Sequence, residues 1–270
     1  MASCNVSPNN KTMKGIYFIS DAHLGSRALK HTRQQERRLC RFLDDIKDRA
    51  QAIYMLGDMF DFWFEYYNVV PKGYTRFLGK VSELTDMGVE VHFFTGNHDI
   101  WCMDYLSKEC GVILHSAPLT LELADKVFYL AHGDGMGDPS WKFRMLRGVF
   151  HNKFCQSAFR LIHPDLGVEL GMRWAKHSRE KHEPYLNNGI GGDPSYLGED
   201  KEHLVLYAKE YLKEHPGINY FIFGHRHIEL DLMLTKDTHV MILGDWVSQC
   251  TYAVWDGERM FLENYIEGES

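Results

Sequence analysis

Short runs of apolar, β-prone residues recur along this chain, and five of them end in a small cluster of polar residues. These runs occupy residues 16–19, 52–56, 91–94, 127–130 and 220–223. Between the early runs, residues 34–48 and 74–87 repeat their apolar positions with the period of an amphipathic helix. Strands that alternate with helices in this way predict an α/β layered fold.

The second half of the chain has a different pattern. Its predicted strands follow one another closely with few helices between them, at residues 119–123, 127–130, 229–234, 240–243, 252–255 and 260–263. Residues 141–181 predict two or three helices, and a loop rich in Gly, Asn and Pro follows at 187–200. We therefore expect a core formed by residues 14–140 and 201–270, with a helical lid inserted at 141–200.

Composition narrows the class of protein. The chain has 270 residues, of which 44% are hydrophobic and 25% charged, so a disordered or fibrous protein is excluded. No run of 18 apolar residues is present, and the polar residues 1–13 predict a flexible tail rather than a secretory signal. The six cysteines form no CxxC pair, which indicates reduced thiols and a cytoplasmic protein.

Charge is distributed unevenly along the chain. The formal net charge of −7 argues against nucleic acid as a partner. Residues 141–181, however, hold nine Lys/Arg and three Asp/Glu, a net +6, and large apolar residues alternate with the basic ones. This pattern is typical of a solvated helical face. It equally fits a lid that meets an anionic, partly apolar ligand or a membrane surface.

Seven potential metal ligands lie at the ends of the predicted strands. Asp21 with His23, and His225 with His227, are pairs at i and i+2, whose side chains point the same way in extended backbone. The other three each follow an apolar run, and they are Asp58, Asn97 and His132. Oxygen and imidazole donors of this kind suit two divalent ions such as Mn²⁺, Fe or Zn. If one carboxylate is shared, each ion receives four protein ligands.

The ordered motifs DAH, GDMFD, GNHD, HGD and GHRH resemble the calcineurin-like metallophosphoesterase superfamily. The resemblance implies a four-layer αββα sandwich that carries two divalent metal ions, with Mn²⁺ as the first expectation. It assigns Asp21, His23 and His227 to one metal. It assigns Asn97, His132 and His225 to the other, with Asp58 bridging the two and Asp61 orienting a ligand.

The same resemblance implies a reaction. The metal pair lowers the pKa of a bound water, which attacks phosphorus in line. His98 would lie beside the leaving oxygen as the general acid, and Asp99 would fix the tautomer of His98.

A narrower resemblance is to the UDP-2,3-diacylglucosamine diphosphatase family of lipid A biosynthesis. It rests on the segment GDMFDFW, the HGD strand end, the basic insertion and the sequence LGDW at residues 243–246. It implies cleavage of the pyrophosphate of a lipid-linked nucleotide into UMP and the lipid 1-phosphate. It also implies a lid over the acyl chains and peripheral contact with the cytoplasmic face of the inner membrane. Substrate contacts are then expected at Asp138, Arg144, Arg147, Ser178, His182, Tyr185 and His225.

Three positions depart from that narrower pattern. The diphosphatases usually have Arg at the position of His98, and their lid motif S-x-x-x-N-x-x-K reads here as Ser178, His182 and Tyr185. The loop at 187–200 adds length. An enzyme acting on another lipid-linked or nucleotide phosphoester therefore stays open as the alternative. A metal-poor interaction scaffold of the same fold would require eroded ligands, whereas all seven are present. The sequence does not indicate an oligomeric state.

Overall fold

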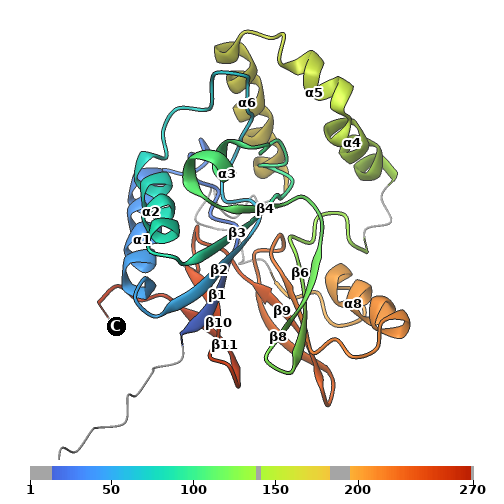
Figure 1. Cartoon of the computed structure of the whole chain (residues 1–270). Helices are drawn as coiled ribbons and strands as arrows, with labels where there is room; N and C mark the ends of the chain where they lie inside the picture. Colours follow the sequence, from blue (N-terminus) through green and yellow to red (C-terminus); the bar gives the residue numbers. More distant parts are fainter. Residues whose placement is uncertain (1–13, 138–140, 183–194, 269–270) are drawn as a thin grey trace, which may run out of the picture.

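Two β-sheets lie face to face at the centre of the molecule, and helices cover their outer faces (Figure 1). The computed structural model describes residues 14–137, 141–182 and 195–268. The predicted tail, residues 1–13, and much of the predicted loop at 187–200 lie outside these ranges.

The first sheet has the strand order β11-β10-β1-β2-β3-β4. Its four parallel strands are β1 (Gly15–Ile19), β2 (Ala50–Leu56), β3 (Glu90–Phe94) and β4 (Ile113–His115). The crossovers between them contain α1 (Thr32–Ile46), α2 (Thr75–Asp86) and α3 (Tyr105–Cys110). The antiparallel strands β10 (Thr251–Trp255) and β11 (Met260–Asn264) complete the sheet. Because β1, β2 and β3 run parallel, their carboxyl ends meet at one edge.

The second sheet has the order β5-β6-β7-β9-β8. Its strands are β5 (Leu119–Leu123), β6 (Lys126–Ala131), β7 (Tyr220–Phe223), β8 (Glu229–Thr235) and β9 (Thr238–Leu243). Helix α8 (His203–Glu214) packs on its outer face through Leu204, Val205 and Ala208. No helix was predicted here from the sequence, although the apolar spacing of these three residues favours one.

The two sheets are joined by a core of large apolar side chains. Phe18 of β1 and Phe128 of β6 are fully buried, and their rings stack at 6.2 Å between the sheets. A second core lies between the first sheet and the helices α1 and α2, and a third lies under α8. The layers are therefore helix, sheet, sheet and helix, which confirms the predicted αββα sandwich.

Three helices form an arch over one end of the sandwich (Figure 1): α4 (Trp141–His151), α5 (Lys153–Phe159) and α6 (Pro164–His182). We call them the three-helix segment. Met172 and Phe159 join it to the core by packing against Phe64 and Trp101. Gly171 allows α6 to approach closely, because a Cβ there would collide with the ring of Phe62. Within the described ranges, none of the helices has the length and apolarity needed to cross a membrane.

Candidate metal centre

Three groups of histidines and acids lie at the carboxyl edges of the sheets, and one of them, His23 with Asp61 and His98, shares His23 with the first of the two clusters described next. In each cluster, one nitrogen or oxygen of every residue lies within 4.8 Å of the others. The first cluster contains Asp21, His23 and His227, and the second contains Asp58, His132 and His225. The parallel strands deliver these residues to the same edge from distant parts of the chain, as the motif order predicted.

The backbone that carries these side chains is strained. Five of the candidate ligands have φ between 43° and 68°, in the left-handed region: Asp21, His23, Asp58, His225 and His227. Such conformations cost free energy in residues other than glycine, and they persist where the surrounding structure enforces them, often at functional sites. The concentration of strain here marks this edge as the functional end of the molecule.

Two glycines make room for the ligands. A Cβ on Gly57 would collide with the ring of His132, and one on Gly96 would collide with the carboxylate of Asp58. These contacts explain why glycine precedes Asp58 in GDMFD and begins GNHD. These two glycines therefore allow the close approach of the loops that carry the candidate ligands.

Asp58 lies between the two clusters. Its Oδ2 atom is 3.3 Å from His132 Nε2 and 3.8 Å from His23 Nε2. Asn97 Oδ1 lies 3.3 Å from His132 Nε2, which places this amide beside the second cluster. The structure thus brings all seven expected ligands together, with Asp58 in the position expected of a bridge.

The charges of the clusters compensate one another. Burial alone would raise the pKa of Asp21, but His227 lowers it well below its usual range. Burial opposes a charge on His132, yet the carboxylate of Asp58 raises the pKa of His132 to about 10. Burial and the charge of His132 lower the pKa of His225 to about 3, so its imidazole is neutral at neutral pH.

This donor set fits a pair of divalent cations. Asp21 Oδ1 is buried and lies 3.4 Å from His227 Nε2 and 3.6 Å from His23 Nε2. The nitrogens and oxygens that face one another in each cluster lie close enough together to bind a common cation. A cation would take the place of the proton on His132, because imidazole binds metals through a deprotonated nitrogen.

The expected orientation of His98 by Asp99 is wrong. The Nδ1 atom of His98 lies 2.9 Å from the main-chain oxygen of Asp61. The buried carboxylate of Asp99 instead accepts hydrogen bonds from main-chain N–H groups, among them those of Met59 at 2.8 Å and Gly96 at 2.7 Å. Asp99 therefore joins the GDMFD and GNHD loops, and the backbone at Asp61 orients His98. Residue spacing alone could not distinguish these two arrangements.

Asp245 is a residue of the centre to which the sequence analysis gave no role. It is fully buried, and its Oδ2 lies 3.3 Å from His227 Nδ1, opposite the nitrogen that faces Asp21. The main-chain N–H groups of Val247 and Ser248 donate to its Oδ1. Asp245 thus holds the ring of His227, as carboxylates behind metal-ligating histidines do. The GDW sequence at 244–246 was the available signal.

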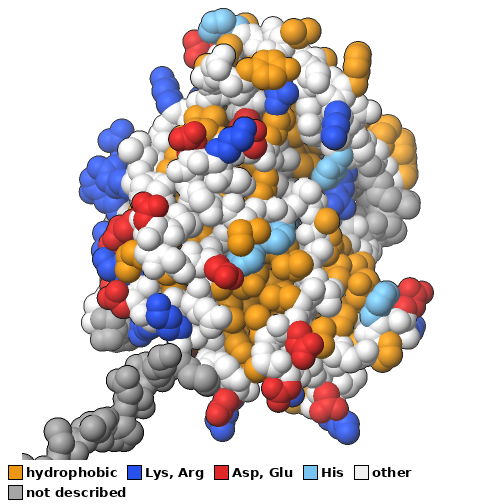
Figure 2. Space-filling model, viewed as in Figure 1, with side chains coloured by type: hydrophobic (Ala, Val, Ile, Leu, Met, Phe, Trp, Pro, Cys, Tyr) orange, Lys and Arg blue, Asp and Glu red, His pale blue; other side chains and the backbone are white. Residues whose placement is uncertain are grey.

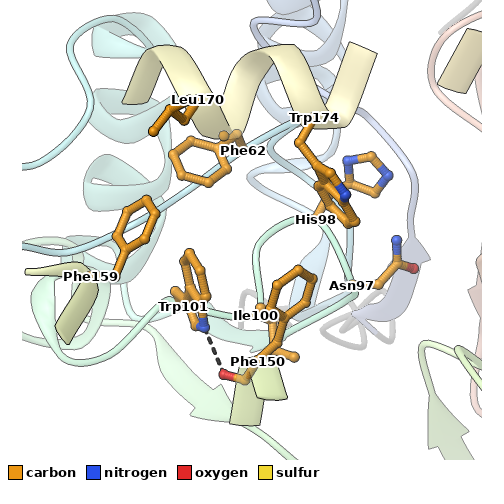
Figure 3. A pocket seen from close by; sticks show the side chains of 10 residues that line it. Phe62, Asn97, His98, Ile100, Trp101, Phe150, Phe159, Leu170 and Trp174 are labelled. Carbon is orange, nitrogen blue, oxygen red and sulfur yellow. Dashed lines mark hydrogen bonds between the residues drawn. The ribbon is translucent and has the colours of Figure 1, made fainter. Parts of the chain in front are cut away.

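An apolar pocket opens beside the second cluster (Figure 3). It has a volume of about 280 Å³, and α6 forms one of its walls. Candidate ligand Asn97 and His98 line its end at the metal centre. Its other lining residues are Phe62, Ile100, Trp101, Phe150, Phe159, Leu170, Gly171 and Trp174.

The expected substrate contacts are less completely described. Asp138 and Tyr185 lie outside the described residues, and Arg144, Ser178 and His182 are described only by their place on helices α4 and α6. Arg147 Nε lies 3.2 Å from the largely buried Asp134 Oδ2. Its guanidinium therefore ties α4 to the HGD strand end.

Comparisons with known proteins agree with this geometry. The model of the calcineurin-like phosphoesterase family matches residues 15–229. A Porphyromonas gingivalis protein named UDP-2,3-diacylglucosamine hydrolase is 44% identical, over 94% of this chain and 98% of that protein. A Haemophilus influenzae protein of the same name is 26% identical, over 87% of this chain and 91% of its own length. A solved dimetal phosphatase from Danio rerio has a TM-score of 0.47 at 15% identity, covering 94% of this chain and 96% of that one. The match across most of the chain, with its motifs in order around one centre, shows that this chain belongs to the calcineurin-like phosphoesterase family.

Proposed function

We propose that this protein hydrolyses the pyrophosphate of UDP-2,3-diacylglucosamine to give UMP and the lipid 1-phosphate. The observation that carries the proposal is the apolar pocket that opens at the metal centre, beside Asn97 and His98. A substrate with an anionic group next to apolar chains fits this juxtaposition. The relatives named for this hydrolase support the same substrate.

In the proposed mechanism, Asp21, His23 and His227 would hold one Mn²⁺, and Asn97, His132 and His225 would hold the other. Asp58 would be the carboxylate shared by the two sites. When bound, such a metal pair supplies an acidic water and neutralises the charge that develops on the phosphoryl oxygens. Asp99 and Asp245 keep the ligand loops and the ring of His227 in place.

His98 is the proposed general acid. Its backbone N–H donates to Asp58 Oδ1 at 2.8 Å, so the residue is fixed to the bridging carboxylate. The Asp61 carbonyl accepts from Nδ1–H, because a carbonyl oxygen can only accept. The Nε2 atom is then the one that can deliver a proton to the leaving oxygen.

The three-helix segment is proposed to belong to a lid, residues 141–200, that selects the acyl chains. Trp174 of α6 lies near His98, with ring centroids 6.3 Å apart, so apolar and reacting parts of a substrate would be adjacent. Each buried methylene contributes roughly 0.8 kcal/mol, and long chains can therefore dominate affinity.

We also propose that the protein works at the cytoplasmic face of the inner membrane. Residues 27–41 hold six Lys/Arg and one Glu, a net +5 in a chain of −7. Arg33, Arg37 and Arg41 are exposed and recur every four residues along α1. Lys and Arg side chains gather on the left edge of the molecule, where α1 lies (Figures 1 and 2). Arg27 joins this region to α6 by an ion pair with Glu169 at 2.6 Å.

The first prediction concerns the bridging carboxylate. Asp58→Asn should leave fewer than two Mn²⁺ per chain after dialysis and lower kcat on bis-p-nitrophenyl phosphate by about 100-fold or more, because metal stabilisation is worth several kcal/mol. Metal analysis and steady-state kinetics measure both effects. The exposed control Asp48→Asn should retain both metals and activity. Two retained metals with normal turnover in Asp58→Asn would contradict the assignment.

A second prediction tests His98 as the general acid. His98→Gln should keep its metal content and lose about 10²–10⁴-fold in kcat on a poor leaving group. It should lose much less on a p-nitrophenyl ester, because p-nitrophenolate leaves without a proton. Equal losses on both substrates, or loss of metal, would assign His98 a structural role instead.

The third prediction concerns the pocket. Leu170→Glu should raise KM for the UDP-linked diacyl sugar about 10-fold, the loss expected when roughly two methylenes lose their contact. The matched control Leu166→Glu is also an exposed leucine of α6 but does not line the pocket. Both variants should cleave bis-p-nitrophenyl phosphate normally. Faster turnover of a soluble nucleotide than of the acylated substrate by the unaltered enzyme would favour the alternative phosphodiesterase.

A fourth prediction locates the membrane contact. The triple variant Lys30→Glu, Arg33→Glu and Arg37→Glu should bind vesicles containing phosphatidylglycerol at least 10-fold more weakly, since each basic residue contributes about 1 kcal/mol near an anionic surface. Vesicle sedimentation measures this change. The control, with the same charge change at Lys201, Lys213 and Lys236, should bind like the unaltered protein. Equal binding by both triple variants would refute the α1 contact.

A further inference from the structure

A half-buried ion pair involves the residue between His225 and His227. The Glu202 side chain is fully buried, and its two oxygens receive the guanidinium of Arg226 at 2.7 Å and 3.1 Å. Arg226 is the residue between His225 and His227 in the GHRH motif. A two-pronged guanidinium–carboxylate contact fixes direction as well as distance.

The loop that Arg226 occupies needs such a restraint. His225 and His227 have φ values of 68° and 52°, so the residues on both sides of Arg226 are held in the left-handed region. The main-chain N–H of Arg226 donates to the Gly224 carbonyl at 2.8 Å, which tightens the turn further. Strained residues keep such a conformation only when neighbouring contacts enforce it.

Glu202 also has a particular place in the fold. It directly precedes α8, just after the proposed lid segment ends. The residues that lead into that segment, 133–137, lie against the first turn of α8. A Cβ on Gly137 would collide with the His203 backbone, and one on Gly133 would touch Leu204. The first turn of α8 is therefore the point where both ends of the segment meet the core.

We propose that the Glu202–Arg226 pair positions His225 and His227 for metal binding and connects them to the base of the lid. The proposal rests on the metal centre described under the proposed function. Both residues are positioning residues, since they act through the backbone of the histidine ligands. A pair that only stabilised α8 would alter the unfolding temperature without altering metal affinity.

The test measures Mn²⁺ binding by calorimetry on metal-depleted full-length protein. Arg226→Gln and Glu202→Gln should each weaken Mn²⁺ binding about 10–100-fold, the effect typical of residues that orient metal ligands. Arg226→Lys keeps the charge but not the two-pronged contact, so it should restore only part of the affinity. The control Glu199→Gln with Lys209→Gln removes a 2.7 Å ion pair between Glu199, which precedes α8, and Lys209 of α8. This control should change the Mn²⁺ affinity less than 2-fold.

The double variant Glu202→Gln with Arg226→Gln guards against failure to fold, because it leaves no unpaired charge buried. If the two residues act as one unit, its loss of Mn²⁺ affinity should be no greater than that of the worse single variant. Unchanged Mn²⁺ affinity in the folded single and double variants would overturn the proposal, even if their unfolding temperatures fall. If the unaltered protein binds no Mn²⁺, the proposed function fails instead.

Discussion

The negative charges of two buried carboxylates, those of Asp21 and Asp58, must be compensated where the two sheets meet. The structure depends on how these charges are compensated. A buried charge is costly unless opposite charge or hydrogen bonds surround it. Here histidines from three separate strand ends provide that surrounding, and the sheets must hold the strand ends within a few ångströms of one another. The close approach at Gly57 and the left-handed backbone of the ligands follow from this requirement.

Three further buried acids surround the candidate ligands, and each fixes a different part of the centre. Asp99 accepts main-chain hydrogen bonds from both loops that carry Asp58 and Asn97. Asp245 holds the ring of His227, and Glu202 holds the residue between the two histidines of GHRH. The sandwich core holds the strands together, and these acids restrain the irregular loops at the strand ends.

The apolar pattern alone predicted only an α/β layered fold, and the ordered motifs, through their resemblance to a known family, predicted the sandwich and the seven converging side chains. The i and i+2 pairs do converge, but in left-handed rather than extended backbone, and the seven residues come from strand ends of both sheets. The partner of Asp99 could not be predicted, since a carboxylate next to His98 in sequence has many backbone donors within reach once the loops are folded. The pairing of Arg147 with Asp134 was missed for a similar reason. A basic residue in a positively charged segment indicates an anionic partner, but not whether that partner belongs to the chain.

The position of the apolar pocket limits what kind of substrate the centre can use well. His98 belongs to both the pocket lining and the surroundings of Asp58, so no polar layer separates the two regions. A wholly polar substrate at the metals would leave the exposed face of Trp174 in contact with water, whereas an amphiphile would cover it as its phosphate arrived. Binding energy gained from these apolar contacts can then hold the phosphate in the reactive position. In the proposed function, the three-helix segment would therefore contact the apolar part of the substrate molecule whose phosphate lies at the metal centre.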